Sequence, residues 1–206
     1  DIQVVGTYLY LAWAHSATNH PGGLEIFSIS NRFLPVSVGH YETDDHVNAV
    51  RVVGNYAYLA VGTARTLTND PGAIEIVELT NPGSPVRVGR IGTLGKANDI
   101  QFEGNFAYVP ESTRWTGTNL LGALEIFDVS NPSLPTRAGV YDCPGSATSV
   151  AVSGAYAYLA DGVTDLRVLD VSTPSNPASI GVYDVDERIV HSAEFAGPAR
   201  YIERVN

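Results

Sequence analysis

Short runs of alternating apolar and polar residues recur along the whole chain and are separated by Gly, Pro and Asn. In the clearest copy these runs cover residues 98–102, 106–109, 124–129 and 136–141. Alternation with a period of two is typical of strands that bury one face, and Gly, Pro and Asn are typical of the turns between strands. No segment combines a helical period with capping residues. The pattern therefore predicts four short strands in each copy and essentially no helix.

The four-strand pattern repeats about every 50 residues. The motif Gly-x-aromatic-x-Tyr begins at Gly6, Gly54, Gly104 and Gly154, which are 48, 50 and 50 residues apart. Each copy continues with an apolar-charged-apolar run, an Asn/Thr-Pro-x-x-Pro segment that is reduced in the first copy, and a glycine that in three copies lies two residues before a tyrosine. The chain is predicted to form a single propeller domain, or a segment of one. The repeat boundaries are predicted at approximately 1–47, 48–97, 98–147 and 148–191, with a half-repeat at 192–206.

Four antiparallel strands in about 50 residues, repeated along the chain, are the signature of a β-propeller blade. We therefore expect an all-β fold, a β-propeller with four blades and half of a fifth. A β-solenoid usually has shorter rungs, and a β-sandwich would not repeat so strictly. Because Gly197 and Tyr201 place residues 192–202 in register with the first two strands of a blade, a half-blade would leave an unpaired strand edge. Either the chain is part of a larger ring, which we favour, or another chain covers that edge in an assembly.

Three segments together resemble the LVIVD repeat family. They are G-N-Y-A-Y-L-A at 54–60, L-E-I-F-D-V-S-N-P-S-L-P at 124–135 and G-V-Y-D at 139–142. The resemblance covers nearly the whole chain and implies a β-propeller, commonly in secreted or surface-attached prokaryotic proteins. It implies no catalytic residues, because the shared motif is structural. The first three copies depart from the motif through an insertion of about eight residues between the second and third strands, where the fourth copy has only residues 161–165.

Composition narrows the possible partners. The formal net charge of -10 favours neither nucleic acid nor an anionic membrane as a partner, and no Lys/Arg run offsets it. No apolar run approaches the roughly 18 residues of a membrane span. The one cysteine, Cys143, cannot form an intrachain disulfide. Because the chain starts at Asp1 inside a strand pattern and contains no methionine, we expect a processed chain or an excised segment.

In a blade of four sequential strands, the loop between strands two and three and the connection to the next blade emerge on the same face. Loops gathered on one face of a repeat array are the usual binding surface. Exposed tryptophans there could stack on a sugar or hold a protein partner, although packing between adjacent insertions is the favoured interpretation. The candidate binding residues on this face are Trp13, His15, His20, Arg65, Arg114 and Trp115.

A metal site on the same face is a second hypothesis. Asp44, Asp45 and His46 form the most concentrated polar group, and His191 belongs to the same face, so calcium or a transition metal could bind there. However, the sequence has neither His-x-His spacing nor a D-x-[DN]-x-[DN]-G calcium loop. Solvated polar loops are therefore favoured, and no cofactor is strongly indicated.

Catalytic motifs are missing from the sequence. There is no nucleophile elbow, dinucleotide fingerprint or phosphate-binding loop, and Cys143 has no histidine beside it. Glu25, Glu75 and Glu125 share one repeat position, which Arg167 occupies in the fourth copy, whereas paired catalytic carboxylates need two unlike environments.

The sequence thus predicts a non-enzymatic extracellular or cell-surface propeller. Its role is binding or structural, with a protein or a glycan as partner and with self-association through the half-blade edge. The alternatives are a metal-dependent enzyme with a site on the loop face and a lectin-like propeller.

Overall fold

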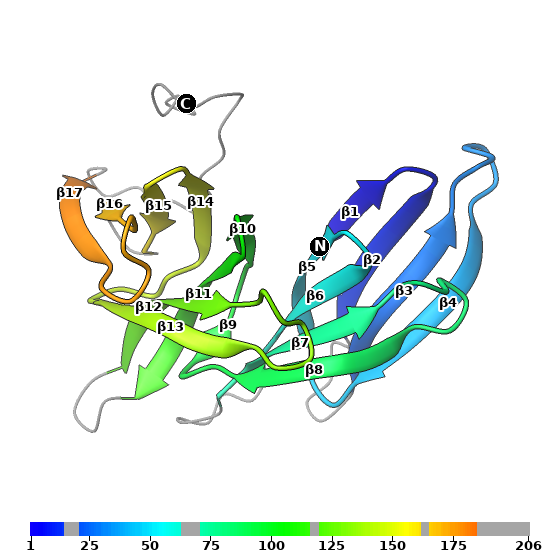
Figure 1. Ribbon diagram of the computed structural model, residues 1–206, viewed down its shortest axis with the longest axis horizontal. Coiled ribbons are helices and arrows are strands. Elements are labelled where there is room, and N and C mark those ends of the chain that lie inside the picture. Colours follow the sequence, from blue (N-terminus) through cyan, green and yellow to red (C-terminus); the bar gives the residue numbers. More distant parts are fainter. Residues whose placement is uncertain (15–20, 63–70, 116–119, 162–164, 185–206) are drawn as a thin grey trace.

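The computed structural model describes residues 1–14, 21–62, 71–115, 120–161 and 165–184. These residues form strands and turns, with no helix among them, and the strands make four antiparallel sheets. Figure 1 shows the sheets following one another as blades, from β1–β4 at one end to β14–β17 at the other. In the part of the chain that the structure describes, no sheet closes the ring, and no helix is long and apolar enough to cross a membrane. The predicted all-β propeller architecture is confirmed.

Each sheet consists of strands that are consecutive in the chain. The first two blades comprise β1 (Ile2–Val5), β2 (Tyr8–Ala14), β3 (Gly22–Ser28) and β4 (Val36–Thr43), then β5 (Val47–Val53), β6 (Tyr56–Val61), β7 (Ala73–Glu78) and β8 (Val86–Gly92). The last two comprise β9 (Lys96–Ala97), β10 (Gln101–Glu103), β11 (Phe106–Trp115), β12 (Leu120–Asp128) and β13 (Thr136–Cys143), then β14 (Ser149–Ser153), β15 (Tyr156–Ala160), β16 (Asp165–Asp170) and β17 (Ala178–Asp184).

The repeated glycines and asparagines form the turns that the sequence indicates. The first two strands of every blade are joined by a two-residue turn whose leading glycine has a φ near +60°, a conformation that favours glycine: Gly6, Gly54, Gly104 and Gly154. The turn between strands three and four begins with a side chain that binds local backbone. The Asn81 carboxamide accepts the Gly83 N–H at 3.1 Å, and the Ser84 N–H donates to the Asn81 carbonyl at 2.9 Å.

Apolar packing joins each blade to the next. We call the side of a blade that packs on the preceding blade its N-side face, and the side that packs on the following blade its C-side face. Between the first two blades, Tyr10 and Ile26 of the first C-side face are buried against Val50 and Leu59 of the second N-side face. Equivalent positions form the second and third clusters, so one interface is built three times in the described chain.

A glycine on the fourth strand allows the blades to approach one another closely. A Cβ on Gly39 would lie 1.8 Å from the carbonyl oxygen of Pro82 in the next blade, and one on Gly89 would lie 2.0 Å from that of Pro132. No side chain fits at such a distance. The repeated glycine and the repeated proline turn are therefore two sides of one contact between blades.

Polar contacts near the start of the first strands also join the blades. The Arg51 guanidinium donates to Asp1 at 2.6 Å and to Asp99 at 3.1 Å, and the Ser149 hydroxyl donates to Asp99 at 3.0 Å. Arg51 is thus paired with an acid on each side of its own blade. This chain of contacts connects the innermost strands of all four blades.

The third blade differs from the expected strand boundaries in two respects. Strand β10 begins at Gln101 rather than at residue 98. The cause is Pro110 on the neighbouring strand, which has no N–H to donate across to the first strand. In the first blade the residue at the position of Pro110 is Ala12, and its N–H donates to the Asp1 carbonyl at 2.9 Å. In addition, β11 and β12 continue into the insertion and pair as far as Trp115 and Leu120, with an irregularity between Glu111 and Arg114. The predicted half-repeat at 192–206 lies outside the described residues.

Candidate functional site

One position on the third strand is charged in all four blades and lies on the N-side face. Glu25, Glu75, Glu125 and Arg167 occupy it. The second-strand position diagonally across from it, on the same face, carries a different residue in each blade: Trp13, Val61, Glu111 and Asp161. These two positions and their fourth-strand neighbours form a polar cluster on the N-side face of each blade, so we take them as the candidate site.

In the first blade the carboxylate is paired with a histidine. Glu25 accepts a hydrogen bond from the Ser37 hydroxyl and lies 3.0 Å from the Nδ1 atom of His40. The other ring nitrogen of His40 lies 3.3 Å from Glu42. The hydrogen bond with Glu25 raises the pKa of His40, which favours its charged form. Trp13 stacks on the same imidazole, with the ring centroids 6.0 Å apart.

In the second blade the carboxylate is buried and binds groups from two blades. Glu75 accepts from the Tyr41 hydroxyl of the first blade at 2.7 Å. It also accepts from Arg87 at 3.1 Å and from Arg90 at 3.2 Å within its own blade. Burial and the hydrogen bond with Glu75 both raise the pKa of Tyr41, so the phenol remains a donor. This carboxylate therefore connects two blades and neutralises cations on the fourth strand.

In the third blade two carboxyl groups meet. Glu125 forms an ion pair with the Nε atom of Arg137 at 2.5 Å and accepts the Leu94 N–H at 3.1 Å. Glu111 accepts the Gly95 N–H at 2.8 Å. Burial, followed by the hydrogen bond with Glu125, raises the pKa of Glu111 to about 11. Glu111 is therefore a neutral acid at neutral pH and shares its proton with Glu125.

In the fourth blade the same two positions carry opposite charges. Arg167 replaces the glutamate, and its Nε atom lies 2.5 Å from the Asp161 carboxylate, which stands at the position of Glu111. The side chains of this pair are 12% and 3% exposed, whereas the cation of the corresponding pair in each of the other blades is at least 36% exposed. The four blades thus neutralise one charged position in four different ways.

Burial determines what these groups can do chemically. A protonated carboxylic acid beside a carboxylate is the arrangement of a general acid–base pair. However, Glu111 and Glu125 are both 0% exposed, which denies a substrate access to either of them. Cys143 is also buried, and burial is the main cause that raises the pKa of its thiol to about 12, so no thiolate nucleophile forms at neutral pH. Glu111, Glu125 and Cys143 are therefore closed to solvent in the folded chain.

The blade connections lie beside the ends of the second and third strands, as the blade topology predicts. The Gly22 N–H donates to the Asp45 carbonyl at 3.0 Å, the Gly72 N–H donates to the Gly95 carbonyl at 2.9 Å, and the Ala147 N–H donates to the Glu111 carbonyl at 3.1 Å. One face of the molecule therefore carries the connections together with the start of each insertion.

The structure describes only part of the predicted binding set. Trp13 is the second-last residue of β2 and lies on the N-side face of the first blade, where it stacks on His40 of the same sheet. Arg114 and Trp115 lie on β11 and pair along the backbone with Leu121 and Leu120, and their side chains lie outside the described part. His15, His20 and Arg65 also fall outside the described residues.

The structure describes three residues of the predicted metal site. Asp44 is exposed, and Asp45 and His46 are half-buried in the turn that leads into β5. The Asp45 carbonyl accepts from the Thr43 hydroxyl at 2.5 Å, and the His46 carbonyl accepts from the Gly62 N–H at 3.0 Å, so both residues have a role in the backbone of the turn. His191 lies outside the described residues, and within the described ones no three His, Cys, Asp or Glu side chains gather as metal ligands would.

Glu111 was missed as a partner of Glu125. The sequence interpretation compared the glutamates of the third strand with one another and not with the second-strand residue beside them. Counting seven residues from the leading glycine of each copy places Glu111 and Asp161 at the position of Trp13 and Val61. That alignment would have shown an acid beside Glu125 and an acid beside Arg167.

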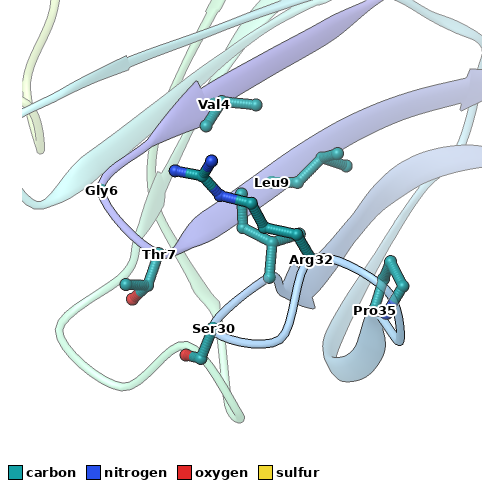
Figure 2. Close-up of a pocket in the computed structure, with 8 residues that line it drawn as sticks. Val4, Gly6, Thr7, Leu9, Ser30, Arg32 and Pro35 are labelled. Carbon is teal, nitrogen blue, oxygen red and sulfur yellow. The ribbon is translucent and has the colours of Figure 1, made fainter.

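The N-side face of the first blade holds a groove of about 490 Å³. Figure 2 shows the Arg32 side chain extending from the turn between β3 and β4 toward Val4 and Leu9, which form the floor of the groove. The remaining residues that line it are Gly6, Thr7, Ile29, Ser30 and Pro35. In the other three blades the corresponding face is covered by the preceding blade.

Comparison with known proteins agrees with the repeat architecture. The family model for the LVIVD repeat matches the chain four times, at residues 1–43, 45–93, 94–143 and 144–185. Each match contains one of the four sheets. No curated protein matches the chain.

Proposed function

The chain belongs to the LVIVD repeat family, and from this premise we propose that it is a non-enzymatic binding protein. Its blades form a rigid framework that presents the insertions between the second and third strands. We further propose that it acts outside the cell or at the cell surface and binds a protein or a glycan, with self-association through the strand edge of the half-repeat as a structural role. The net charge of -10 supports a partner other than nucleic acid.

The observation that carries this proposal is the pairing of the repeated charged residues with one another. Glu75, Glu125 and Arg167 are each neutralised by a neighbouring group on the same or an adjacent blade. Those contacts join neighbouring strands and blades. They also occupy the carboxylates and the Arg167 guanidinium with structural partners, so these groups are not free to act on a substrate. The three insertions depart from the repeat pattern, and the described residues that flank them lie at the end of the blades where the connections gather, which is where rigid scaffolds carry recognition loops.

Exchange of the insertions tests the proposal. Residues 15–20, 63–70 and 113–120 are deleted one at a time, which leaves each connection as long as residues 161–165 of the fourth blade. Each variant is screened with the parent chain on a glycan array. We expect the parent to bind a defined set of glycans, and at least one shortened variant to lose that binding with an unchanged unfolding temperature. Leu134→Arg, in a turn at the opposite end of a blade, is the control and should bind like the parent.

Two further results bear on the alternatives. Loss of glycan binding in Trp115→Ala would favour the lectin-like form of the proposal. Stoichiometric metal in the purified chain, lost in both His46→Ala and His191→Ala, would instead support a metal-dependent enzyme. Glycan binding that survives shortening of all three insertions would contradict the role given to them.

A further inference from the structure

The fourth strand of the second blade carries two arginines on the same face. Residues three apart in a regular strand point to opposite faces, but the register between β7 and β8 shifts at Val88. This extra residue turns Arg87 to the N-side face, where Arg90 also lies, and both side chains donate to Glu75. The irregularity in β8 therefore brings two cations to one carboxylate.

Glu75 compensates only one of these two positive charges. Arg87 and Arg90 donate to the same oxygen, Oε1, at 3.1 Å and 3.2 Å, and the other oxygen accepts from the neutral Tyr41 hydroxyl. Among the described residues Arg90 donates to no other acceptor, and Arg87 otherwise meets only the Tyr41 hydroxyl. The two arginine side chains are 46% and 50% exposed, so their remaining N–H groups are open to solvent.

The second blade lacks an acid that the other blades carry beside this position. Two residues after the position of Arg90, the fourth strands have Glu42, Gly92, Asp142 and Asp184. In the first blade this acid binds the cation on its own strand, because the Glu42 carboxylate lies 3.3 Å from the Nε2 atom of His40, which occupies the position of Arg90. Arg90 has no corresponding acid on its strand.

Gly92 leaves open the space that the acid would fill. A Cβ on Gly92 would meet no atom within 4 Å, and the residue opposite it on β7 is the small Ala73. Gly92 is not among the glycines with a positive φ, so its backbone conformation does not require a glycine. The space beside Arg90 is thus open on the N-side face, between the first two blades.

The charges around the arginines limit the ligand that they can bind. Glu75, and after it Asp44, raise the pKa of Arg87, although Asp44 forms no ion pair with either arginine. The whole chain has a net charge of -10. A polyanion is therefore repelled, whereas a ligand with one isolated acidic group gains the attraction of the two guanidinium groups without much repulsion.

We propose that Arg87 and Arg90 bind the carboxylate of a ligand in the space beside Gly92, at the place that the Glu42 carboxylate takes in the first blade. Guanidinium groups match carboxylates through pairs of N–H donors, and both arginines keep donors for this contact. Glu75 holds both guanidinium groups in place, so little side-chain freedom is lost when the ligand binds. The inference does not depend on the role proposed for the insertions.

Titration with sodium acetate and with sodium glucuronate tests this site, at constant ionic strength and with glucose as the uncharged match. In NMR spectra of the arginine Nε–H groups, we expect both carboxylates to shift Arg87 and Arg90, with a dissociation constant in the roughly millimolar range. Tighter binding of glucuronate than of acetate would identify the ligand as an acidic sugar. Arg32, an exposed arginine of the first blade, is the control and should not shift. Absence of a shift at Arg87 and Arg90 with both carboxylates would overturn the proposal.

Substitutions beside the arginines provide a second test. Gly92→Glu supplies the acid that the first blade has, and the open space at its Cβ allows the chain to fold. We expect it to weaken acetate binding at least roughly 10-fold, whereas Gly92→Gln, which has the same size without the charge, should weaken it by less than about 3-fold. Asp44→Asn should strengthen binding roughly 2- to 3-fold, because it removes a repelling charge. Unchanged binding in a folded Gly92→Glu chain, or an equal loss in the Glu and Gln variants, would contradict the proposed contact.

Discussion

At the scale of single residues, the charged position on the third strand is neutralised by different partners in the four blades. The charged group at this position has a partner in every blade: a histidine for Glu25, two arginines and a tyrosine for Glu75, and a protonated acid with an arginine for Glu125. In the fourth blade the ion pair is reversed, because Arg167 occupies the position and binds Asp161. The repeat at this position could be predicted from the sequence, and so could its structural role. The partners could not, because they come from other strands and from the preceding blade, at distances along the chain that no local pattern reveals.

The Glu111–Glu125 pair leads to a prediction about pH. The folded-state pKa of Glu111 lies above its ordinary value of 4.5, so its contribution to stability is complete below that pH and is progressively lost as the pH rises toward about 11. Glu111→Gln keeps a donor to Glu125 without this cost. We expect it to raise the free energy of unfolding at pH 7 by about 1–3 kcal/mol, measured by urea denaturation.

Measuring the free energy of unfolding of Glu111→Gln and of the parent at several pH values provides the control for this substitution. The advantage of Glu111→Gln over the parent should shrink toward pH 4.5 and grow at alkaline pH. Glu103→Gln, an exposed glutamate of the same blade, should show no such trend. A destabilised Glu111→Gln chain at pH 7 would show that Glu111 is ionised in the folded protein.

His40 should show a smaller dependence on pH. Its pKa is raised by Glu25, so its contribution is complete below the ordinary value of 6.5 and disappears as the pH rises through the folded-state value. Because the side chain is 46% exposed, we expect an effect well under about 1 kcal/mol. The free energy of unfolding of the parent minus that of His40→Gln should be larger at pH 5.5 than at pH 8.5. An equal difference at both values would rule out the charged pair.

At the scale of elements, the strands follow the alternation of the sequence, and the exceptions have local causes. The two-residue turns could be predicted from the glycine that lies two residues before an aromatic residue in each copy, because a turn of this kind favours a glycine with a positive φ. The shortened strand β10 could not be predicted, since it results from Pro110 on the facing strand rather than from its own residues. The extension of β11 and β12 toward residues 115 and 120 was missed because the insertion does not alternate in a simple way.

The glycine of the fourth strand gives a prediction at the same scale. Gly89→Ala places a Cβ 2.0 Å from the Pro132 carbonyl oxygen, so the blades must move apart. We expect a loss of about 1–3 kcal/mol in the free energy of unfolding, as for other overpacked contacts. Gly181→Ala is the matched control, because its Cβ meets only ordinary contacts. Equal stabilities for the two variants would contradict the close contact between blades.

At the scale of the whole molecule, the fold is a series of equivalent interfaces rather than one central core. Three apolar clusters lie between successive blades, and the two faces at the ends of the series remain open in the described chain. Such a series could be predicted from the repeats, because each blade needs a neighbour to bury its apolar face. Which side chains define each interface emerges only when the four sheets are aligned in space.

The central claim is that the repeated charged residues hold the blades together, and Glu75 tests it most directly. Its carboxylate binds Tyr41 of the preceding blade together with Arg87 and Arg90, and it is almost completely buried. Urea denaturation of Glu75→Leu should show a loss of about 2–4 kcal/mol in the free energy of unfolding relative to the parent, whereas Glu103→Gln should change it little. A Glu75→Leu chain that is as stable as the parent would contradict the account.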